Sequence, residues 1–191
     1  MTTATVFRPR VLADVVPGGA IRDVVLVVAV AALTGAAAQV ALPLPFTPVP
    51  LSLQTFAVVL SAAALGPWRA GAAMGLYLVA GIAGVPWFSE QRAGFAFPSF
   101  GYIIGFVLAA VIVGTLARRG ADRRVGSAVL IMVLGNLAIY AIGVPYLAVA
   151  IGVSLPEALA LGALPFVIGD ALKIVLAAGL LPAAWSLVDR R

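Results

Sequence analysis

Charged side chains are absent from four long stretches of this sequence. These stretches cover residues 24–68, 70–89, 93–117 and 125–156. A helix that crosses the hydrocarbon core of a bilayer needs about 20 predominantly apolar residues, and each stretch is near or above that length. The pattern predicts an all-α fold in which the chain crosses a membrane several times. The composition agrees, because 63% of the residues are hydrophobic and 10% are charged, with a mean hydropathy of +1.16.

Proline and glycine residues divide the apolar stretches into six expected transmembrane helices. The expected ranges are residues 22–42, 51–65, 70–83, 101–117, 125–151 and 165–187. We interpret residues 1–191 as a single six-helix membrane domain, in which residues 1–20 form a short cytoplasmic N-terminal segment. The second and third helices are shorter than a bilayer requires, so we expect them to be tilted or surrounded by protein. The fifth is a candidate for a bend near Pro145.

The basic residues indicate how these helices are oriented. With six spans and both termini cytoplasmic, ten of the twelve Lys and Arg residues fall on the cytoplasmic side: Arg8, Arg10, Arg22, Arg69, Arg118, Arg119, Arg123, Arg124, Arg190 and Arg191. Only Arg92 and Lys173 fall elsewhere. Cytoplasmic loops carry an excess of Lys and Arg, so we predict that both termini of this multi-pass protein face the inside of the cell (inner) membrane. The net charge of +5 follows from this topology and is not a sign of nucleic-acid binding.

The residue types that are missing exclude several kinds of chemistry. The sequence contains no Cys and no His, which removes disulfides, thiolate or imidazole metal sites and His-based acid–base catalysis. The seven acidic residues are scattered, and no Walker-type phosphate-binding loop occurs. We therefore expect no enzyme activity, no catalytic residue, no metal and no cofactor. Any ATP hydrolysis that drives this protein must come from a partner.

Two ionisable residues, Asp170 and Lys173, interrupt the last apolar stretch. Residues three apart on a helix lie on the same face, so both side chains can point into one cavity. Placing either charge against hydrocarbon costs about 2.5–3.5 kcal/mol even on the mildest insertion scale. A small molecule with polar and anionic groups would compensate for both charges, which makes these residues the leading candidates for substrate binding. The alternative is a structural ion pair that only neutralises itself.

Further polar and aromatic side chains are expected near the outer surface, around the same pocket. These substrate-binding candidates are Gln54, Tyr77, Trp87, Arg92 and Asn136, with Tyr140 on the helix face of Asn136. An apolar pocket with a few convergent polar groups is typical of a ligand site. Structural alternatives exist, because Gln54 and Asn136 can bond to neighbouring helices. The tyrosines can equally be packing residues with satisfied hydroxyls.

The expected external connection, residues 85–100, is long and aromatic. It contains Trp87, Phe88, Phe95, Phe97 and Phe100, together with Arg92. Long loops without regular structure often serve as lids, and we favour that interpretation because a lone external arginine lies within the loop. An aromatic belt at the membrane surface is the alternative.

Small residues recur at four-residue spacing in several predicted helices, and most densely in the first. The pairs are Ala31/Gly35, Ala32/Ala36, Gly71/Gly75 and Gly101/Gly105. Such pairs allow helix backbones to approach closely in lipid. For Ala32 and Ala36, packing within this protein and docking of another membrane protein both remain open.

Five segments of the chain are similar to those of one known family. They read PLPFTPVPLSLQTF at residues 43–56, LGP at 65–67, YLVAGIAGVPWF at 77–88, GYIIGF at 101–106 and PFVIGDALK at 165–173. In this order they resemble BioY, the biotin-specific S component of energy-coupling factor (ECF) transporters, over essentially the whole chain. The family usually reads Gly-Pro-Thr-Gly-Gly-Tyr before the fourth helix, where this chain has Phe97 and Phe100 in place of two glycines.

The resemblance implies six helices, biotin capture near the outer surface, and partners: a transmembrane T component and two ATPase subunits. It also implies that the Ala-rich first helix, with Ala32 and Ala36, is a docking face. Biotin suits the candidate residues, because Asp170 can accept from its ureido N–H groups and Lys173 and Arg92 can meet its carboxylate. Tyr77 and Trp87 can cover the apolar body.

Two alternatives remain within the transporter class: an S component for another vitamin, or a self-sufficient biotin carrier that works without ATPase partners. A channel is disfavoured because polar residues are expected along the full depth of a pore, whereas the inner halves of these helices are almost wholly apolar.

Overall fold

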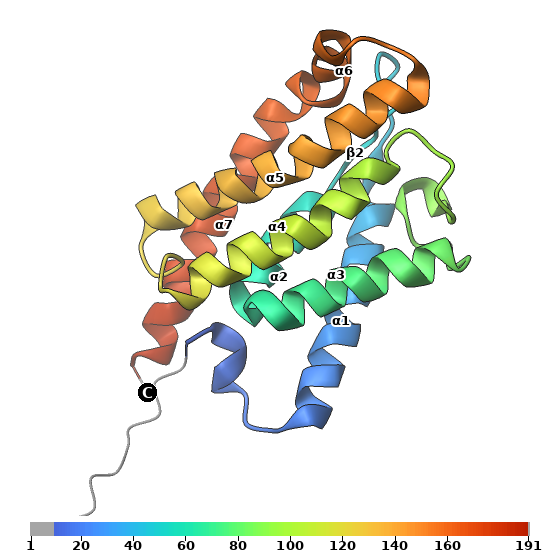
Figure 1. Ribbon diagram of the computed structural model, residues 1–191. Coiled ribbons are helices and arrows are strands. Elements are labelled where there is room, and N and C mark those ends of the chain that lie inside the picture. Colours follow the sequence, from blue (N-terminus) through green and yellow to red (C-terminus); the bar gives the residue numbers. More distant parts are fainter. Residues whose placement is uncertain (1–9, 191) are drawn as a thin grey trace, which may run out of the picture.

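The computed structural model describes residues 10–190, which form a bundle of seven α-helices (Figure 1). The helices are α1 (Ala20–Gln39), α2 (Gln54–Leu65), α3 (Pro67–Ile82), α4 (Phe100–Arg118), α5 (Val125–Ile151), α6 (Leu155–Gly162) and α7 (Val167–Val188). Three short 3-10 helices accompany them: η1 (Leu12–Val15), η2 (Ser89–Gln91) and η3 (Leu164–Phe166). The predicted helical fold is confirmed. The expectations for Arg8 and Arg191, and for residues 1–9 of the N-terminal segment, lie outside the described residues.

Two connections differ from the prediction. The first helix ends at Gln39 and the second begins at Gln54, because an antiparallel pair of strands, β1 (Ala41–Leu42) and β2 (Leu51–Ser52), lies between them. Four prolines in residues 43–50 explain this, since proline breaks helices and keeps the residue before it extended. The predicted sixth helix is preceded by α6, which begins at a capping serine: Ser154 Oγ accepts a hydrogen bond from the Glu157 backbone N–H.

Four helical segments are long and apolar enough to cross a membrane. They are α1, α4, α5 and the stretch Leu155–Val188, which contains α6 and α7. Helix α2 has 12 residues and a length of about 18 Å at 1.5 Å per residue, against a hydrocarbon core of about 30 Å. Eight of its residues are buried. The prediction that this short helix is surrounded by protein is therefore confirmed.

Helices α4 and α5 form the most extensive contact in the bundle, and Gly105 allows them to approach closely. A Cβ atom at this position would lie 2.8 Å from the Ile139 carbonyl oxygen and 2.9 Å from the Ile139 Cα. At Gly101, one turn earlier, it would lie 2.2 Å from the Cβ of Tyr146. The Gly101/Gly105 pair is thus a packing contact within this protein, as small residues at four-residue spacing predict.

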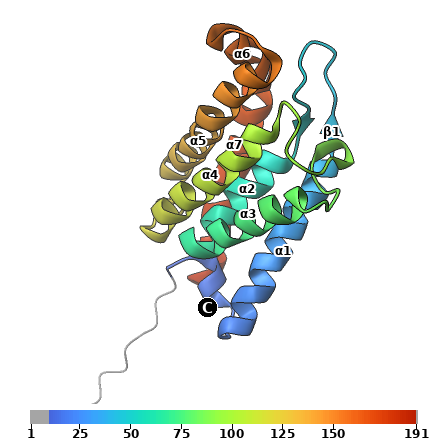
Figure 2. The same cartoon turned by 45° about the vertical axis from the view of Figure 1, so that its right-hand side comes forward.

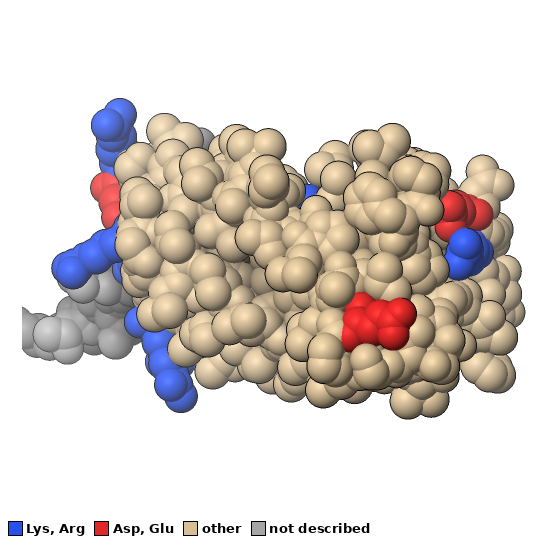
Figure 3. All heavy atoms as spheres, turned by 90° about the horizontal axis from the view of Figure 1, so that it is seen from above, with Lys and Arg blue, Asp and Glu red and all other residues tan. Residues whose placement is uncertain are grey.

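The bundle has two distinct ends (Figures 1 and 2). The hairpin end carries the β1–β2 hairpin, the 84–99 connection and α6. The terminal end carries η1, the α4–α5 loop (residues 119–124) and the C-terminal end of α7. Figure 3 shows one face of the molecule, on which Lys and Arg side chains gather at one edge and most of the area beyond them is uncharged. This distribution is typical of a protein that crosses an apolar layer.

Candidate functional site

A cavity lies at the hairpin end, enclosed by four helices and two loops. Its walls come from the hairpin, the 84–99 connection, and helices α2, α4, α5 and α7: Val49, Pro50, Leu51, Ser52, Gln54, Thr55, Ser89, Phe97, Ser99, Tyr102, Ile103, Phe106, Tyr140, Phe166, Asp170 and Lys173. Its volume is about 60 Å³. The lining is apolar apart from a few polar groups, and that composition is typical of a small-molecule site.

Asp170 and Lys173 are the charged groups in this lining, and they meet there. They lie three residues apart on α7, so one helix face carries both. Lys173 Nζ lies 3.3 Å from Asp170 Oδ1 and donates a hydrogen bond to Thr55 Oγ1 at 2.9 Å. The Tyr140 hydroxyl donates to Asp170 Oδ2. The side chains of Asp170 and Lys173 are 8% and 12% exposed. The prediction that both charges share one cavity is confirmed.

The pair retains hydrogen-bonding capacity for a ligand. Charge-assisted N–H···O bonds are usually about 2.7–2.9 Å long, so the 3.3 Å contact between Lys173 and Asp170 is loose. A carboxylate offers about four acceptor positions and an ammonium three donors, and Asp170 and Lys173 each use two in the contacts described. The cavity therefore presents an anionic acceptor beside a cationic donor, between apolar walls.

Gln54 lines the cavity and links it to the 84–99 connection. Its Nε2 donates to the Tyr77 hydroxyl at 2.5 Å, and its Oε1 accepts from Ser89 Oγ at 3.2 Å. The glutamine is 5% exposed, and both ends of its amide are satisfied. It therefore connects α2, α3 and the loop above the cavity.

Tyr77 and Trp87 do not line the cavity, in contrast to the sequence-based expectation. The Tyr77 hydroxyl donates to the Trp87 carbonyl at 3.0 Å, and Trp87 Nε1 donates back to the Tyr77 carbonyl at 2.9 Å. Their rings lie 5.0 Å apart. These reciprocal bonds turn both side chains toward each other, so they fasten the 84–99 connection to α3.

Arg92 and Asn136 also lie outside the cavity lining. Arg92 pairs with Glu90 at 2.6 Å, its guanidinium lies 5.7 Å from the centre of the Phe97 ring, and its side chain is 38% exposed. The nearby carboxylate thus holds it at the surface. Asn136 is buried on α5, one turn before Tyr140, and about 6 Å closer to the terminal end along the helix. The cavity ends at the level of Tyr140.

The aromatic 84–99 connection is folded onto the bundle as a wall of the cavity. Ser89, Phe97 and Ser99 belong to the lining. Phe88 is fully buried, with its ring against Gly81, where an added Cβ would lie 2.0 Å from a ring carbon. Phe97 contacts Phe88, with ring centres 5.8 Å apart. This arrangement favours the lid over the aromatic belt.

Several lining residues escaped sequence analysis. Thr55 accepts a hydrogen bond from Lys173, but a threonine in an apolar helix does not by itself indicate a binding site. Ser52 and Pro50 enter the site through the hairpin, which the sequence did not predict. Tyr140 was recognised only as a neighbour of Asn136; its distance of 30 residues from Asp170 conceals their contact.

Helix α1 separates its two pairs of small residues onto different faces. Ala31 and Gly35 are buried, and a Cβ atom at Gly35 would lie 3.2 Å from Trp87 Cβ. Ala32 and Ala36 are exposed and border a shallow hollow of about 450 Å³. The first pair therefore packs within the protein, and the second faces outward.

The described residues contain no cluster of acidic side chains able to hold a metal ion.

Comparison with known proteins identifies relatives of this chain and a solved structure with the same fold. The BioY family model matches residues 5–190. The chain is 37% identical over 155 residues to a protein named probable biotin transporter BioY from Pyrococcus horikoshii, covering 80% of this chain and 89% of that one. It is 32% identical over 168 residues to a protein named biotin transporter BioY from Rhizobium etli, covering 82% and 89%.

A solved structure shares the fold. It is described as the S-component for biotin from an ECF-type ABC transporter, and it superposes with a TM-score of 0.77 at 21% sequence identity, covering 87% of this chain and 92% of that one. This likeness concerns the fold alone. The family match over residues 5–190 and the two relatives above establish that this chain belongs to the BioY family.

Proposed function

We propose that this chain binds biotin and takes it up across the cell membrane, as the substrate-specific S component of an ECF transporter. Family membership supports this function, and the site supports the ligand. One observation carries the proposal: Asp170 and Lys173 meet in an apolar cavity, joined by Tyr140 and Thr55. Such a pair offers both an acceptor and a donor to one small polar ring.

The ureido ring of biotin matches this pair. Asp170 accepts from the ureido N–H groups, and Lys173 donates to the ureido carbonyl oxygen. The sequence left open whether Lys173 or Arg92 meets the carboxylate. Lys173 lies 3.3 Å from Asp170, whereas the carboxylate of biotin is separated from the ureido group by a bicyclic ring and a four-carbon chain. One end of the ligand therefore engages both residues.

The carboxylate of biotin then points toward the 84–99 connection, which carries Arg92. In this arrangement the ligand carboxylate replaces Glu90 as the partner of Arg92. Phe97, Phe106 and Phe166 line the cavity and cover the apolar body of the ligand. These three aromatic residues take the role that the sequence suggested for Tyr77 and Trp87.

Ligand uptake requires the two loops over the cavity to move. The cavity volume of about 60 Å³ is below the roughly 300–1,000 Å³ of ligand pockets. Hydrogen bonds from Gln39, Tyr77 and Tyr146 to the loop, from Trp87 to α3 and from Ser89 to Gln54 hold the loop over the cavity. Their breakage would allow the 84–99 connection to swing outward as a lid.

The proposal places the hairpin end outside the cell and both termini in the cytoplasm, with six crossing helices. It rests on the distribution of arginines between the two ends. A reporter enzyme fused after Arg190 should be active only in the cytoplasm. Activity of that reporter in the periplasm would contradict the orientation.

The exposed pair Ala32 and Ala36 is the proposed docking face for the transmembrane T component, which recruits the two ATPase subunits. Small residues at this spacing permit close helix approach. Replacing Ala32 or Ala36 with Leu should reduce co-purification with these subunits and leave biotin binding intact. The matched control is Leu33→Ile, an apolar substitution on the same turn.

Calorimetry of the purified chain tests the central proposal. We expect saturable binding of biotin with one site per chain, weaker binding of biotin methyl ester, and no binding of other vitamins at the same concentration. Tighter binding of another vitamin would reassign the substrate. Biotin uptake by cells that express this chain without ATPase partners would favour the self-sufficient carrier.

A further inference from the structure

A strongly basic groove lies at the terminal end, far from the biotin cavity. It has a volume of about 780 Å³. Five arginines and a serine face it: Arg10, Arg118, Arg119, Arg123, Arg124 and Ser127. We refer to these five as the groove arginines. Concentrating five positive charges around one hollow is unfavourable unless an anion occupies it.

The loop that carries most of these arginines is held in place. Gly120 turns the chain with a φ of +90°. Asp122 Oδ2 accepts a hydrogen bond from Trp185 Nε1 at 2.6 Å, which ties the loop to α7. The Arg123 guanidinium lies 4.2 Å from the centre of the Trp185 ring, a cation–π contact. The groove is therefore preformed.

Within residues 10–190, most of the groove arginines have no carboxylate partner. At the same end, Arg69 and Arg22 pair with Asp14 and Asp23 at 2.7–2.9 Å. In contrast, four of the groove arginines, Arg123 aside, form no ion pair within residues 10–190. Asp122 is completely buried and bonded to Trp185. Within the described residues, Arg22 and Arg69 are thus neutralised by carboxylates, whereas Arg10, Arg118, Arg119 and Arg124 remain available to an anion.

The groove lies where a bilayer surface is expected. Helix α4 ends at Arg118 and α5 begins at Val125, and both are long enough to cross a membrane. Their connecting loop is therefore at the depth of lipid headgroups. Beyond it, α5 exposes an apolar face that includes Leu130 and Leu137, each 57% exposed.

We propose that the groove binds the phosphate headgroup of an anionic phospholipid, whose acyl chains lie along the exposed face of α5. Guanidinium groups bind phosphate oxygens in a two-point geometry, and basic pockets between membrane helices suit anionic headgroups. The first turn of α5 adds backbone N–H groups with no side-chain cap. This lipid site is independent of the biotin cavity.

Native mass spectrometry of the full chain in a nonionic detergent tests this site. Phosphatidylglycerol should bind more tightly than phosphatidylcholine. Each basic residue near an anionic surface contributes about fivefold in affinity, so Arg118→Gln/Arg119→Gln should weaken phosphatidylglycerol binding by about 25-fold. The control Arg92→Gln/Arg190→Gln removes the same charge outside the groove and should retain binding. Arg118→Lys/Arg119→Lys keeps the charge but loses the two-point geometry, so its affinity should lie between those of the parent and the glutamine variant.

Four results would overturn the proposal. Equal affinities for the two lipids, or equal losses in the groove and control variants, would show that the groove does not recognise the headgroup. Full competition by soluble glycerol phosphate would indicate a site for a free anion. Unchanged lipid binding together with lost co-purification of ATPase subunits would indicate a protein partner for this surface.

Discussion

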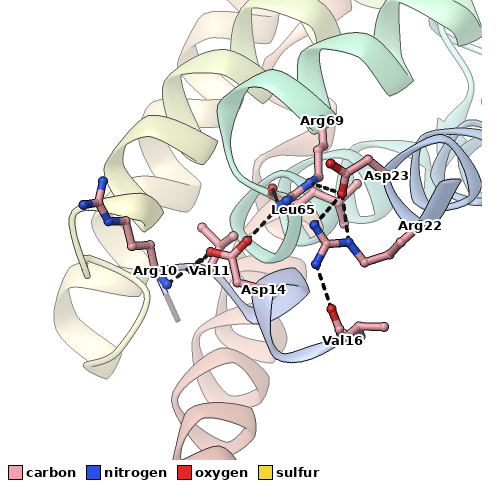
Figure 4. Close-up of polar contacts among 8 residues, drawn as sticks. All are labelled: Arg10, Val11, Asp14, Val16, Arg22, Asp23, Leu65 and Arg69. Carbon is pink, nitrogen blue, oxygen red and sulfur yellow. Dashed lines mark hydrogen bonds and ion pairs between the residues drawn. The ribbon is translucent and has the colours of Figure 1, made fainter. Parts of the chain in front are cut away.

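Within residues 10–190, two partly buried clusters of opposite charges lie at opposite ends of the bundle. At the terminal end, Arg69 Nε lies 2.8 Å from Asp23 Oδ1, and its terminal nitrogen lies 2.9 Å from Asp14 Oδ1 (Figure 4). Arg22 completes that cluster, 2.7 Å from Asp23. At the hairpin end, Lys173 lies 3.3 Å from Asp170. The first cluster is short and closed, and the second is longer and faces a cavity.

This difference separates an ion cluster that holds the fold from one that is available to a ligand. The Arg69 cluster joins η1, α1 and α3 (Figure 4). Burial acts to raise the pKa of Asp14, but hydrogen bonds from Arg69 and from the Val11 and Arg10 backbones outweigh it, so that pKa is lowered. The native structure thus stabilises the Asp14 carboxylate through the protein's own donors. In the second cluster, we propose that the ligand supplies the missing partners.

The largest expected effect concerns the Arg69 cluster, which we call the closed cluster. Arg69→Met leaves Asp14 and Asp23 without their shared cation, and breaking a buried ion pair costs about 3–5 kcal/mol. Because the two carboxylates are partly exposed, we expect about half of this, a fall of roughly 5–10 °C in melting temperature. Biotin affinity measured well below that temperature should remain within about twofold. A large loss of affinity with an unchanged melting temperature would reverse the assignment of the two clusters.

The Asp170–Lys173 cluster, which we call the open cluster, should respond in the opposite way: biotin affinity should fall and the melting temperature should hardly change. Asp170→Asn removes the charged acceptor for the ureido N–H groups, and a hydrogen bond to a charged group contributes about 1.5–3 kcal/mol. Calorimetry should therefore show biotin affinity reduced by more than tenfold. Circular dichroism melting should show a small change, since Tyr140 and Lys173 keep an oxygen acceptor at position 170. Affinity within twofold of the parent would remove Asp170 from the site.

A smaller expected effect distinguishes the roles of Arg92 and Lys173 in biotin binding. Arg92→Gln should weaken biotin binding by about two- to fivefold, the range of a partly exposed ion pair, and leave biotin methyl ester binding unchanged. Lys173→Met should weaken biotin and its ester to the same degree, because both carry the ureido group. The reverse pattern, with the ester insensitive to Lys173→Met, would assign the carboxylate to Lys173 instead.

The smallest expected effect concerns Asp122, the carboxylate behind the groove arginines. Burial raises its pKa, although the Trp185 hydrogen bond and Arg123 act against the rise. An acid with a raised folded-state pKa destabilises the fold as the pH rises from its ordinary value of 3.8 through the raised one. Asp122→Asn should therefore raise the melting temperature slightly at pH 7, with no gain at pH 4. An equal gain at both pH values would contradict this explanation.

The sequence predicted the parts of this molecule that depend on local patterns. Apolar runs located the principal helices, and the three-residue spacing of Asp170 and Lys173 correctly placed both in one cavity. The sequence could not predict where the Tyr77 and Trp87 side chains point, because their reciprocal hydrogen bonds depend on how the 84–99 connection folds. The position of the Arg92 side chain depends on its ion pair with Glu90, two residues away in an irregular loop, and the sequence could not predict this pairing either. Ser154 and Glu157 are a sequence signal for the start of helix α6. They lie in a long apolar run, so α6 was not predicted as a separate helix.

One measurement tests most directly whether the open cluster binds the ligand or only neutralises itself. Calorimetry of the double variant Asp170→Asn/Lys173→Met with biotin, on protein whose fold is verified by circular dichroism, separates these possibilities. We predict a folded protein whose biotin affinity is lower than that of either single variant, because both polar partners of the ureido ring are removed. Recovery of binding to the parental affinity in the double variant would show that Asp170 and Lys173 serve only each other, and would contradict the proposed site.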